Sequence, residues 1–149
     1  VVAIGRNPEK EELFTTDERA ELMRGLVGDM PGQVDVHVYE GLTVDYARKI
    51  KASAILRGIR NVTDLNFEFQ LALTNRTVAD IETVFILTGE QHAFTSSSLI
   101  KQIAAYGSTD GLEQLMPAAA LSLLKAKIPQ LKERSKRKWV RNDALHDET

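Results

Sequence analysis

The middle of the chain reads Ile55-Leu-Arg-Gly-Ile-Arg-Asn-Val-Thr-Asp-Leu-Asn-Phe-Glu-Phe-Gln70. A short apolar run ends in Arg57-Gly-Ile-Arg60, a polar turn follows, and a helix then carries Glu68 on an otherwise apolar surface. Two arginines on either side of a glycine are poorly suited to a protein core. Guanidinium groups fork onto phosphate or carboxylate, and glycine lets a ligand approach the backbone. The pattern therefore predicts one half of a phosphate-binding site.

Short apolar runs and longer amphipathic segments alternate on both sides of this stretch. The apolar runs predict buried strands at residues 1–5, 34–38, 54–56 and 83–87. The amphipathic segments predict helices from Thr15 or Thr16 to 27, and at 44–50, 64–76, 96–106 and 117–127, with Thr15 and Glu18 as a capping box and Asp64 as a cap. Strands that alternate with helices are joined by parallel crossovers, so we expect an α/β fold with an open parallel sheet covered by helices on both faces.

Groups suited to anion binding follow the end of each predicted strand. Lys10 follows the first strand, Thr43 the second, Arg57 and Arg60 the third, and the segment 92–98 the fourth. In open parallel sheets, ligands bind beyond the carboxyl ends of the strands. We therefore expect these groups to lie along one edge of the sheet.

Three serines, Ser96-Ser97-Ser98, stand at the start of a predicted helix, and Lys101 follows one turn later. Free backbone N–H groups, hydroxyl donors and the positive end of the helix dipole together suit a phosphate. A plainer interpretation is that one serine caps the helix and the other two are solvated. The cationic loop expected on the same sheet edge favours the phosphate site.

The charged residues near the two arginines have structural alternatives. Arg57 and Arg60 can pair with Asp64 or Glu68 to lock the turn, although a surface pair contributes at most about 1 kcal/mol. Glu68 can serve as a partner for Arg60, or it can orient that arginine and contact a nucleotide. Lys10 lies in a charged loop, where a solvated lysine is ordinary.

Composition limits the classes of function. A chain of 149 residues that is 43% hydrophobic and 27% charged suits one globular domain with a core. The absence of cysteine excludes disulfides, thiolate metal sites and a cysteine nucleophile. No apolar stretch reaches the roughly 20 residues that span a bilayer, so we expect a cytoplasmic protein without a membrane partner. The three histidines form no ligand pattern, and any Mg²⁺ would enter bound to phosphates.

The end of the chain is strongly basic. Residues 125–141 hold eight basic side chains and one acidic side chain, a net charge of +7 within a chain whose net charge is −2. We interpret this segment as a solvated basic helix or as a surface that packs on a partner subunit. Nucleic acid is not an expected partner.

Several stretches together resemble the phosphopantetheine adenylyltransferases, nucleotidyltransferases of coenzyme A synthesis. The resemblance runs to about Lys127 and rests on Val2-Ala-Ile-Gly-Arg-Asn-Pro8, Leu13-Phe-Thr15, Gly41-Leu-Thr-Val-Asp-Tyr-Ala47, Arg57-Gly-Ile-Arg60, Phe67-Glu-Phe-Gln-Leu-Ala72, Asn75-Arg76, Glu82-Thr-Val-Phe85 and Phe94-Thr-Ser-Ser-Ser-Leu-Ile-Lys101. It implies a Rossmann-like open parallel sheet from which the family's first strand-helix unit is absent.

The resemblance also implies a role for each matching residue. The positions that match the family's contacts to 4'-phosphopantetheine are Lys10, Thr43 and Arg57. The positions that match its ATP contacts are Gly58, Ile59, Arg60, Glu68, His92, Ala93, Phe94, Thr95, Ser96, Ser97 and Ser98. The implied reaction transfers an adenylyl group from ATP, with Mg²⁺ bound through the ATP phosphates and pyrophosphate released. Dephospho-coenzyme A or coenzyme A is the implied product or feedback ligand, and the implied assembly is a homohexamer.

The sequence departs from the family at its beginning. The family's Gly-Thr/Ser-Phe-Asp-Pro turn and its Thr-x-Gly-His-type motif, whose histidine stabilises the transition state, do not occur in it. We therefore assign no catalytic residue, and we expect the natural protein to have residues upstream of Val1. A chain that begins at Val1 is expected to bind nucleotide or coenzyme A weakly and to have little transfer activity.

Two further expectations concern organisation and function. We expect residues 1–128 to form a nucleotidyltransferase domain that lacks this first unit, and residues 129–149 to form a basic extension, helical and then disordered. Two alternatives remain: a nucleotidyltransferase for another phosphorylated acceptor, and a non-catalytic module that binds nucleotide or coenzyme A or serves assembly.

Overall fold

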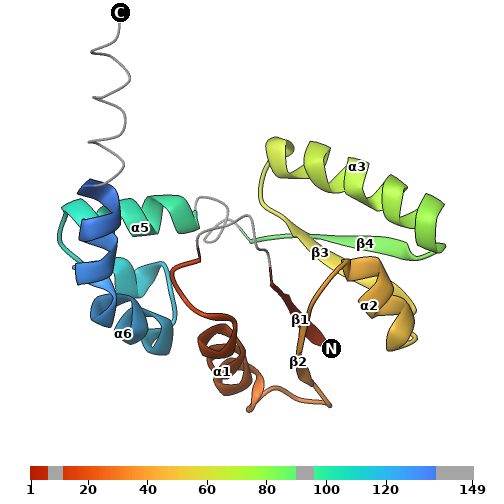
Figure 1. Cartoon of the computed structure of the whole chain (residues 1–149), viewed down its shortest axis with the longest axis horizontal. Helices are drawn as coiled ribbons and strands as arrows, with labels where there is room; N and C mark the ends of the chain where they lie inside the picture. Colours follow the sequence, from red (N-terminus) through yellow and green to blue (C-terminus); the bar gives the residue numbers. More distant parts are fainter. Residues whose placement is uncertain (7–11, 90–95, 137–149) are drawn as a thin grey trace, which may run out of the picture. The chain divides into compact units, whose positions relative to one another are not determined.

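A computed structural model describes residues 1–6, 12–89 and 96–136 (Figure 1). The chain divides into two compact units, Val1–Phe94 and Thr95–Thr149. The first unit contains β1 (Val2–Gly5), α1 (Thr16–Val27), β2 (Val36–Tyr39), α2 (Thr43–Lys49), β3 (Ala54–Ile59), α3 (Val62–Ala79) and β4 (Glu82–Leu87). The second contains α5 (Ser97–Tyr106), the 3-10 helix η1 (Leu112–Gln114), α6 (Ala118–Ala126) and a helical stretch at 128–136. Parallel strands that alternate with helices confirm the predicted α/β class.

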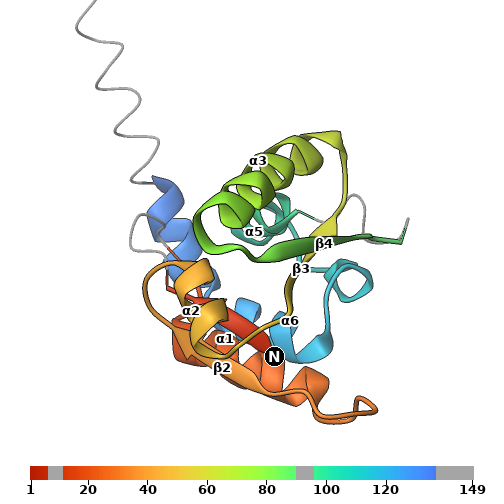
Figure 2. The same cartoon turned by 90° about the vertical axis from the view of Figure 1, so that its right-hand side faces the viewer.

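The described strands form two parallel pairs. β1 pairs with β2, with Val2 opposite Val36 and Gly5 opposite Tyr39. β3 pairs with β4 in the same parallel sense, with Ala54 opposite Glu82. The four strands therefore lie in two two-stranded sheets and not in one continuous ladder. Figure 2 shows α3 running along the β3–β4 pair, and α1 packs against β1 and β2.

Each half of the first unit has its own apolar core. Ile4, Ala20 and Val36 join the β1–β2 pair to α1. A second cluster joins α2 to the end of α3 and the residue before β4, and its members are Val44, Ala47, Ala79 and Ile81. These two clusters hold the helices against the strand pairs.

The capping interactions confirm one prediction and correct another. The Thr15 hydroxyl oxygen accepts a hydrogen bond from the Glu18 backbone N–H at 3.2 Å, and the Glu18 carboxylate accepts one from the Thr15 N–H at 2.7 Å. The predicted capping box is therefore present. The prediction that Asp64 caps α3 was wrong, because Asn61 has the extended backbone of a cap and its side chain accepts from the Asp64 N–H at 2.9 Å. The Asp64 carboxylate is left to bind elsewhere.

β3 is longer than the sequence predicted. The apolar run ends at Leu56, but the strand continues to Ile59 because Gly58 and Ile59 pair with Ile86 and Leu87. Side chains alternate along a strand, so Arg57 shares a face with Ile59. Arg57 and Gly58 therefore belong to the rigid strand, and only Arg60 follows it.

The second unit has its own buried apolar residues. Leu112 of η1 and Leu124 of α6 are each 1% exposed, and Ile100, Ala104 and Leu131 are also buried. Helical structure resumes at residue 128 with Pro129 in its first turn, a position that proline tolerates. Along the described chain, we find no helix long and apolar enough to cross a membrane.

Candidate functional site

Arg57 is fixed by a carboxylate of α3. Its Nε donates a hydrogen bond to Glu68 Oε2 at 2.7 Å, and its Nη2 donates to Glu68 Oε1. The Glu68 side chain is only 11% exposed, whereas the Arg57 side chain is 44% exposed. The hydrogen bond to Glu68 raises the pKa of Arg57, although burial works in the opposite direction. The Glu68 carboxylate therefore holds the charged guanidinium of Arg57 in a set orientation beside the strand.

Arg60 has a different carboxylate partner. Its Nε and Nη2 donate to Asp64 Oδ2 at 2.8 Å and Oδ1 at 3.2 Å. This hydrogen bonding lowers the pKa of Asp64 and raises that of Arg60. The prediction that Glu68 pairs with Arg60 was wrong. Arg57 points toward α3 from the strand, and Arg60 lies one helical turn before Asp64, so each arginine meets its own acid.

A cavity of about 200 Å³ lies beside the Arg57–Glu68 pair. Its lining comes from α2, β3, α3 and β4 and comprises Leu42, Thr43, Val44, Ile55, Arg57, Glu68, Leu71, Ala72, Asn75 and Thr83. The structure thus brings together Thr43 and Arg57, two residues that the sequence predicted for one substrate. Asn75 is buried, and the buried Thr83 hydroxyl has no hydrogen-bond partner within the described residues. The cavity therefore offers a cation and several polar groups on a largely apolar wall.

The Thr43 hydroxyl is held by a tyrosine at the end of β2. Thr43 Oγ1 lies 2.7 Å from the Tyr39 hydroxyl. The Tyr39 ring stacks on the ring of Tyr46, with ring centroids 4.7 Å apart and ring planes 14° apart. The hydroxyl oxygen of Tyr46 in turn lies 2.5 Å from Nδ1 of His37. Thr43, on the cavity wall, is therefore joined to a small aromatic cluster.

Gly58 and Ile59 differ in what they can offer a ligand. Ile59 is 4% exposed, so its side chain belongs to the core, and its carbonyl accepts a hydrogen bond from the Thr88 N–H at 3.0 Å. A Cβ added at Gly58 would meet only Thr88 Cγ2, at 3.7 Å. The glycine is therefore not required by packing. Its exposed backbone is open to a ligand between the two arginines.

The serine segment has the geometry of a helix cap. The Ser96 side chain accepts a hydrogen bond from the Leu99 N–H at 3.5 Å, and Ser97 and Ser98 lie exposed in the first turn of α5. This arrangement agrees with both interpretations of the sequence. The other predicted site residues, Lys10, His92, Ala93, Phe94 and Thr95, lie outside the described residues.

Sequence reasoning missed several residues of the site. Tyr39 occupies the last position of β2, so the rule of carboxyl strand ends would have selected it. Leu71 and Asn75 extend the α3 face that carries Glu68, at spacings of three and seven residues, and the helical period would have selected them. No rule applied to the sequence would have selected Thr83, because it lies at the amino end of its strand and not at the carboxyl end.

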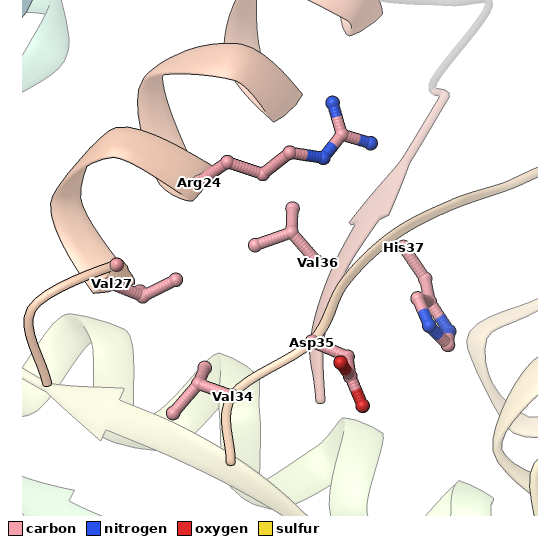
Figure 3. Close-up of a pocket in the computed structure, with 7 residues that line it drawn as sticks. Arg24, Val27, Val34, Asp35, Val36 and His37 are labelled. Atoms are coloured by element: carbon pink, nitrogen blue, oxygen red, sulfur yellow. The ribbon is translucent and has the colours of Figure 1, made fainter. Parts of the chain in front are cut away.

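A larger cavity, of about 300 Å³, lies at the amino end of β2. Figure 3 shows that Val36 points toward helix α1, from which Arg24 extends, whereas Asp35 and His37 point to the other side of the strand. The charged groups on its wall therefore do not converge on one ligand position. We assign no function to this cavity.

Metal ligands do not gather in the described part of the chain. No group of three or more histidine, aspartate or glutamate side chains there has a metal-binding arrangement. The two carboxylates nearest the site, Asp64 and Glu68, are both bound to arginines.

Comparisons with known proteins point to the same chemistry. The cytidylyltransferase-like family matches residues 1–103. The chain is 43% identical to a phosphopantetheine adenylyltransferase of Anaeromyxobacter sp. over 129 residues, which cover 86% of this chain and 77% of the relative. It is 40% identical to that of Synechococcus elongatus over 136 residues, covering 91% and 80% of the two chains. It is 44% identical to that of Caldanaerobacter subterraneus over 108 residues, covering 72% and 67%. The chain belongs to the phosphopantetheine adenylyltransferase family of cytidylyltransferase-like proteins.

Proposed function

We propose that this protein transfers the adenylyl group of ATP reversibly to 4'-phosphopantetheine, giving dephospho-coenzyme A and pyrophosphate. The observation that carries the proposal is the cavity beside β3 and α3, where Arg57, fixed by Glu68, lies with Thr43. A guanidinium beside a hydroxyl is suited to one end of a phosphorylated substrate. The printed names of the relatives supply the substrate class.

The cavity wall supports 4'-phosphopantetheine over a smaller phosphorylated acceptor. Leu42 and Leu71 offer apolar surface to the dimethyl part of the pantetheine arm. Asn75 and the unpaired Thr83 hydroxyl can bond the two amides of that arm. An orphaned buried hydroxyl costs free energy until it finds a partner, so a ligand amide at this position would be favoured.

The ATP side is proposed to be built around Arg60. The exposed Gly58 lies between it and Arg57, which Glu68 anchors. Ser96, Ser97 and Ser98, at the start of α5, are proposed to hold the leaving phosphates, because a helix N-terminus offers N–H donors and a positive dipole end. Lys10 and residues His92 to Thr95 stay proposals from the family resemblance.

The reaction proposed here needs no covalent enzyme intermediate. An oxygen of the pantetheine phosphate attacks the α-phosphorus of ATP, a new P–O bond forms, and the α–β bridging bond breaks as pyrophosphate leaves. Two anions must approach each other, so Arg57 and Arg60 lower the barrier by neutralising charge and by alignment.

Mg²⁺ fits this site only as a partner of the nucleotide. Asp64 and Glu68 are engaged by arginines, so the phosphate oxygens would supply its ligands within the described part of the site. When bound there, the ion would neutralise charge on the phosphates. The residues of the chain position the two substrates around it.

The test is pyrophosphate release from ATP by the 149-residue chain, with 4'-phosphopantetheine, nicotinamide mononucleotide and glycerol phosphate as alternative acceptors. We expect release that is slow and that depends on 4'-phosphopantetheine. Faster release with another acceptor would contradict the proposed substrate. Binding of both ligands without any release would favour the non-catalytic alternative, and rapid release would contradict the expectation of low activity.

We also propose that the chain assembles with copies of itself. α3 carries exposed apolar side chains on more than one side, including Phe67 at 65%, Phe69 at 52% and Leu73 at 51% exposure. A contiguous exposed apolar surface commonly marks an interface. Light scattering that gives a monomer mass at micromolar concentrations would contradict this, and Phe67→Ser should shift any oligomer toward the monomer.

A further inference from the structure

Tyr39 is held in place from three sides. Its ring stacks on Tyr46 of α2, and its hydroxyl lies 2.7 Å from Thr43 Oγ1. On the third side lies Gly5 of β1, where an added Cβ would come within 2.7 Å of the Tyr39 hydroxyl oxygen and 2.8 Å of Cζ. Gly5 therefore leaves the space that the tyrosine fills. A side chain constrained in this way holds its hydroxyl in one position.

The hydroxyl has a specific partner, which separates its role from that of the ring. A phenylalanine would fill the same space and keep the stack on Tyr46, but it would leave Thr43 Oγ1 without this bond. A phenol is a stronger acid than an aliphatic alcohol, so the favoured arrangement has Tyr39 donating and Thr43 accepting. A threonine hydroxyl that accepts through one lone pair keeps its own hydrogen for another acceptor.

Tyr39 reaches the cavity through Thr43. Thr43 and Arg57 line the same cavity. The Tyr39 hydroxyl, 2.7 Å from Thr43 Oγ1, is therefore placed to set the orientation of one of these two groups.

We propose that Tyr39 is a positioning residue for the acceptor phosphate, because its hydroxyl orients Thr43 so that the threonine donates a hydrogen bond to the phosphate that Arg57 holds. The inference rests on the proposed function, in which Arg57 and Thr43 bind that phosphate. It assigns to Tyr39 a role through Thr43 and none in the chemical step. The contribution should therefore depend on the presence of the phosphate.

The experiment compares two matched variants of the full chain by titration calorimetry. Tyr39→Phe should raise the Kd for 4'-phosphopantetheine roughly 3- to 10-fold, the effect of one lost hydrogen bond. The same variant should leave the Kd for pantetheine, which lacks the phosphate, and the Kd for ATP unchanged. Tyr46→Phe removes a hydroxyl from the same ring stack without touching Thr43, so it should leave all three values unchanged.

The outcomes separate this inference from the proposed function. Equal weakening of 4'-phosphopantetheine and pantetheine by Tyr39→Phe would mean that the tyrosine only shapes the cavity, and no weakening would overturn the proposal directly. Arg57→Gln reports on the proposed function itself. If Arg57→Gln also leaves 4'-phosphopantetheine binding intact, or if the unaltered chain does not bind it, the acceptor site is elsewhere and both proposals fail.

A second variant checks the proposal through the backbone. Gly5→Ala would place a methyl group against the Tyr39 hydroxyl and so displace it from Thr43. It should reproduce the loss seen with Tyr39→Phe, and Gly5→Ala in the Tyr39→Phe background should add less than it does alone. If the effects of Gly5→Ala and Tyr39→Phe on the binding free energy of 4'-phosphopantetheine were fully additive, the two changes would not both act through Thr43, and the proposal would be contradicted.

Discussion

Arg57 and Arg60 lie three residues apart, yet the chain holds them in different ways. Arg57 lies within a strand and binds a carboxylate that is 11% exposed, next to a cavity. Arg60 follows the strand and binds Asp64, a carboxylate one helical turn away, with the two side chains 40% and 24% exposed. The first pair is part of the architecture of β3 and α3. The second is a local pair at the surface.

This difference suits the two arginines to the two different substrates that we propose for them. A cation fixed by a buried acid cannot move far, so it suits a ligand that enters a preformed cavity. A cation held by a surface carboxylate can exchange that carboxylate for a phosphate at little cost. The four predictions below test this contrast, starting with the largest expected effect.

Arg57→Gln should lower the free energy of unfolding by about 2 kcal/mol, because it removes the charged partner of a nearly buried carboxylate. The partial exposure of Arg57 keeps the loss below that of a fully buried pair. Urea denaturation followed by circular dichroism measures it. The double variant Arg57→Gln with Glu68→Gln should recover part of the loss, and a double variant as unstable as the sum of the two single variants would contradict the pairing.

Gly58→Ala should leave stability nearly unchanged, because a Cβ there meets only Thr88 Cγ2 at 3.7 Å. The methyl group would nevertheless stand on the backbone that we propose ATP approaches, and we expect the Kd for ATP to rise roughly 3- to 10-fold by loss of about one hydrogen bond. Calorimetry measures the affinity and a melting curve the stability. An unchanged Kd for ATP would contradict the proposal that ATP contacts the backbone at Gly58.

Arg60→Gln should lower the free energy of unfolding by less than about 0.5 kcal/mol, the usual value for an exposed pair within one helical turn. The same urea titration as for Arg57→Gln measures it. Equal losses of unfolding free energy for Arg57→Gln and Arg60→Gln would contradict the distinction between the Arg57–Glu68 pair and the surface Arg60–Asp64 pair.

The smallest expected effect is a pH dependence of the Arg60–Asp64 pair. The hydrogen bond from Arg60 holds the pKa of Asp64 below its ordinary value of 3.8. The pair therefore stabilises the fold above that ordinary value, and the stabilisation disappears as pH falls through the lowered pKa of the folded state. The melting temperature of Asp64→Asn should lie slightly below that of the unaltered chain near neutral pH, and the two should converge as pH falls below the lowered pKa of Asp64. A gap that persists in acid would assign the effect to something other than charge.

The sequence predicted the class of fold correctly, whereas the roles of the site residues stay predictions. Helical period and strand runs located the elements, and the carboxyl-end rule brought Thr43 and Arg57 to one cavity. The length of β3 was missed at Arg57 and Gly58, because the apolar run ends at Leu56 while the pairing with β4 continues to Ile59. The sequence offered Asp64 and Glu68 as partners of the two arginines, but it could not say which acid meets which arginine, since pairing depends on which way a strand side chain faces. Thr83 became visible only when packing placed it on the cavity wall.

The most direct test of the central claim is a crossed titration of Arg57→Gln and Arg60→Gln with 4'-phosphopantetheine and with ATP, giving four dissociation constants. We predict that the Arg57 variant loses affinity for 4'-phosphopantetheine by at least roughly tenfold, which is the effect of one lost charged hydrogen bond. The same variant should retain ATP binding. The Arg60 variant should show the reverse. If both variants lose the same ligand, or if neither loses any, the assignment of one arginine to each substrate is wrong.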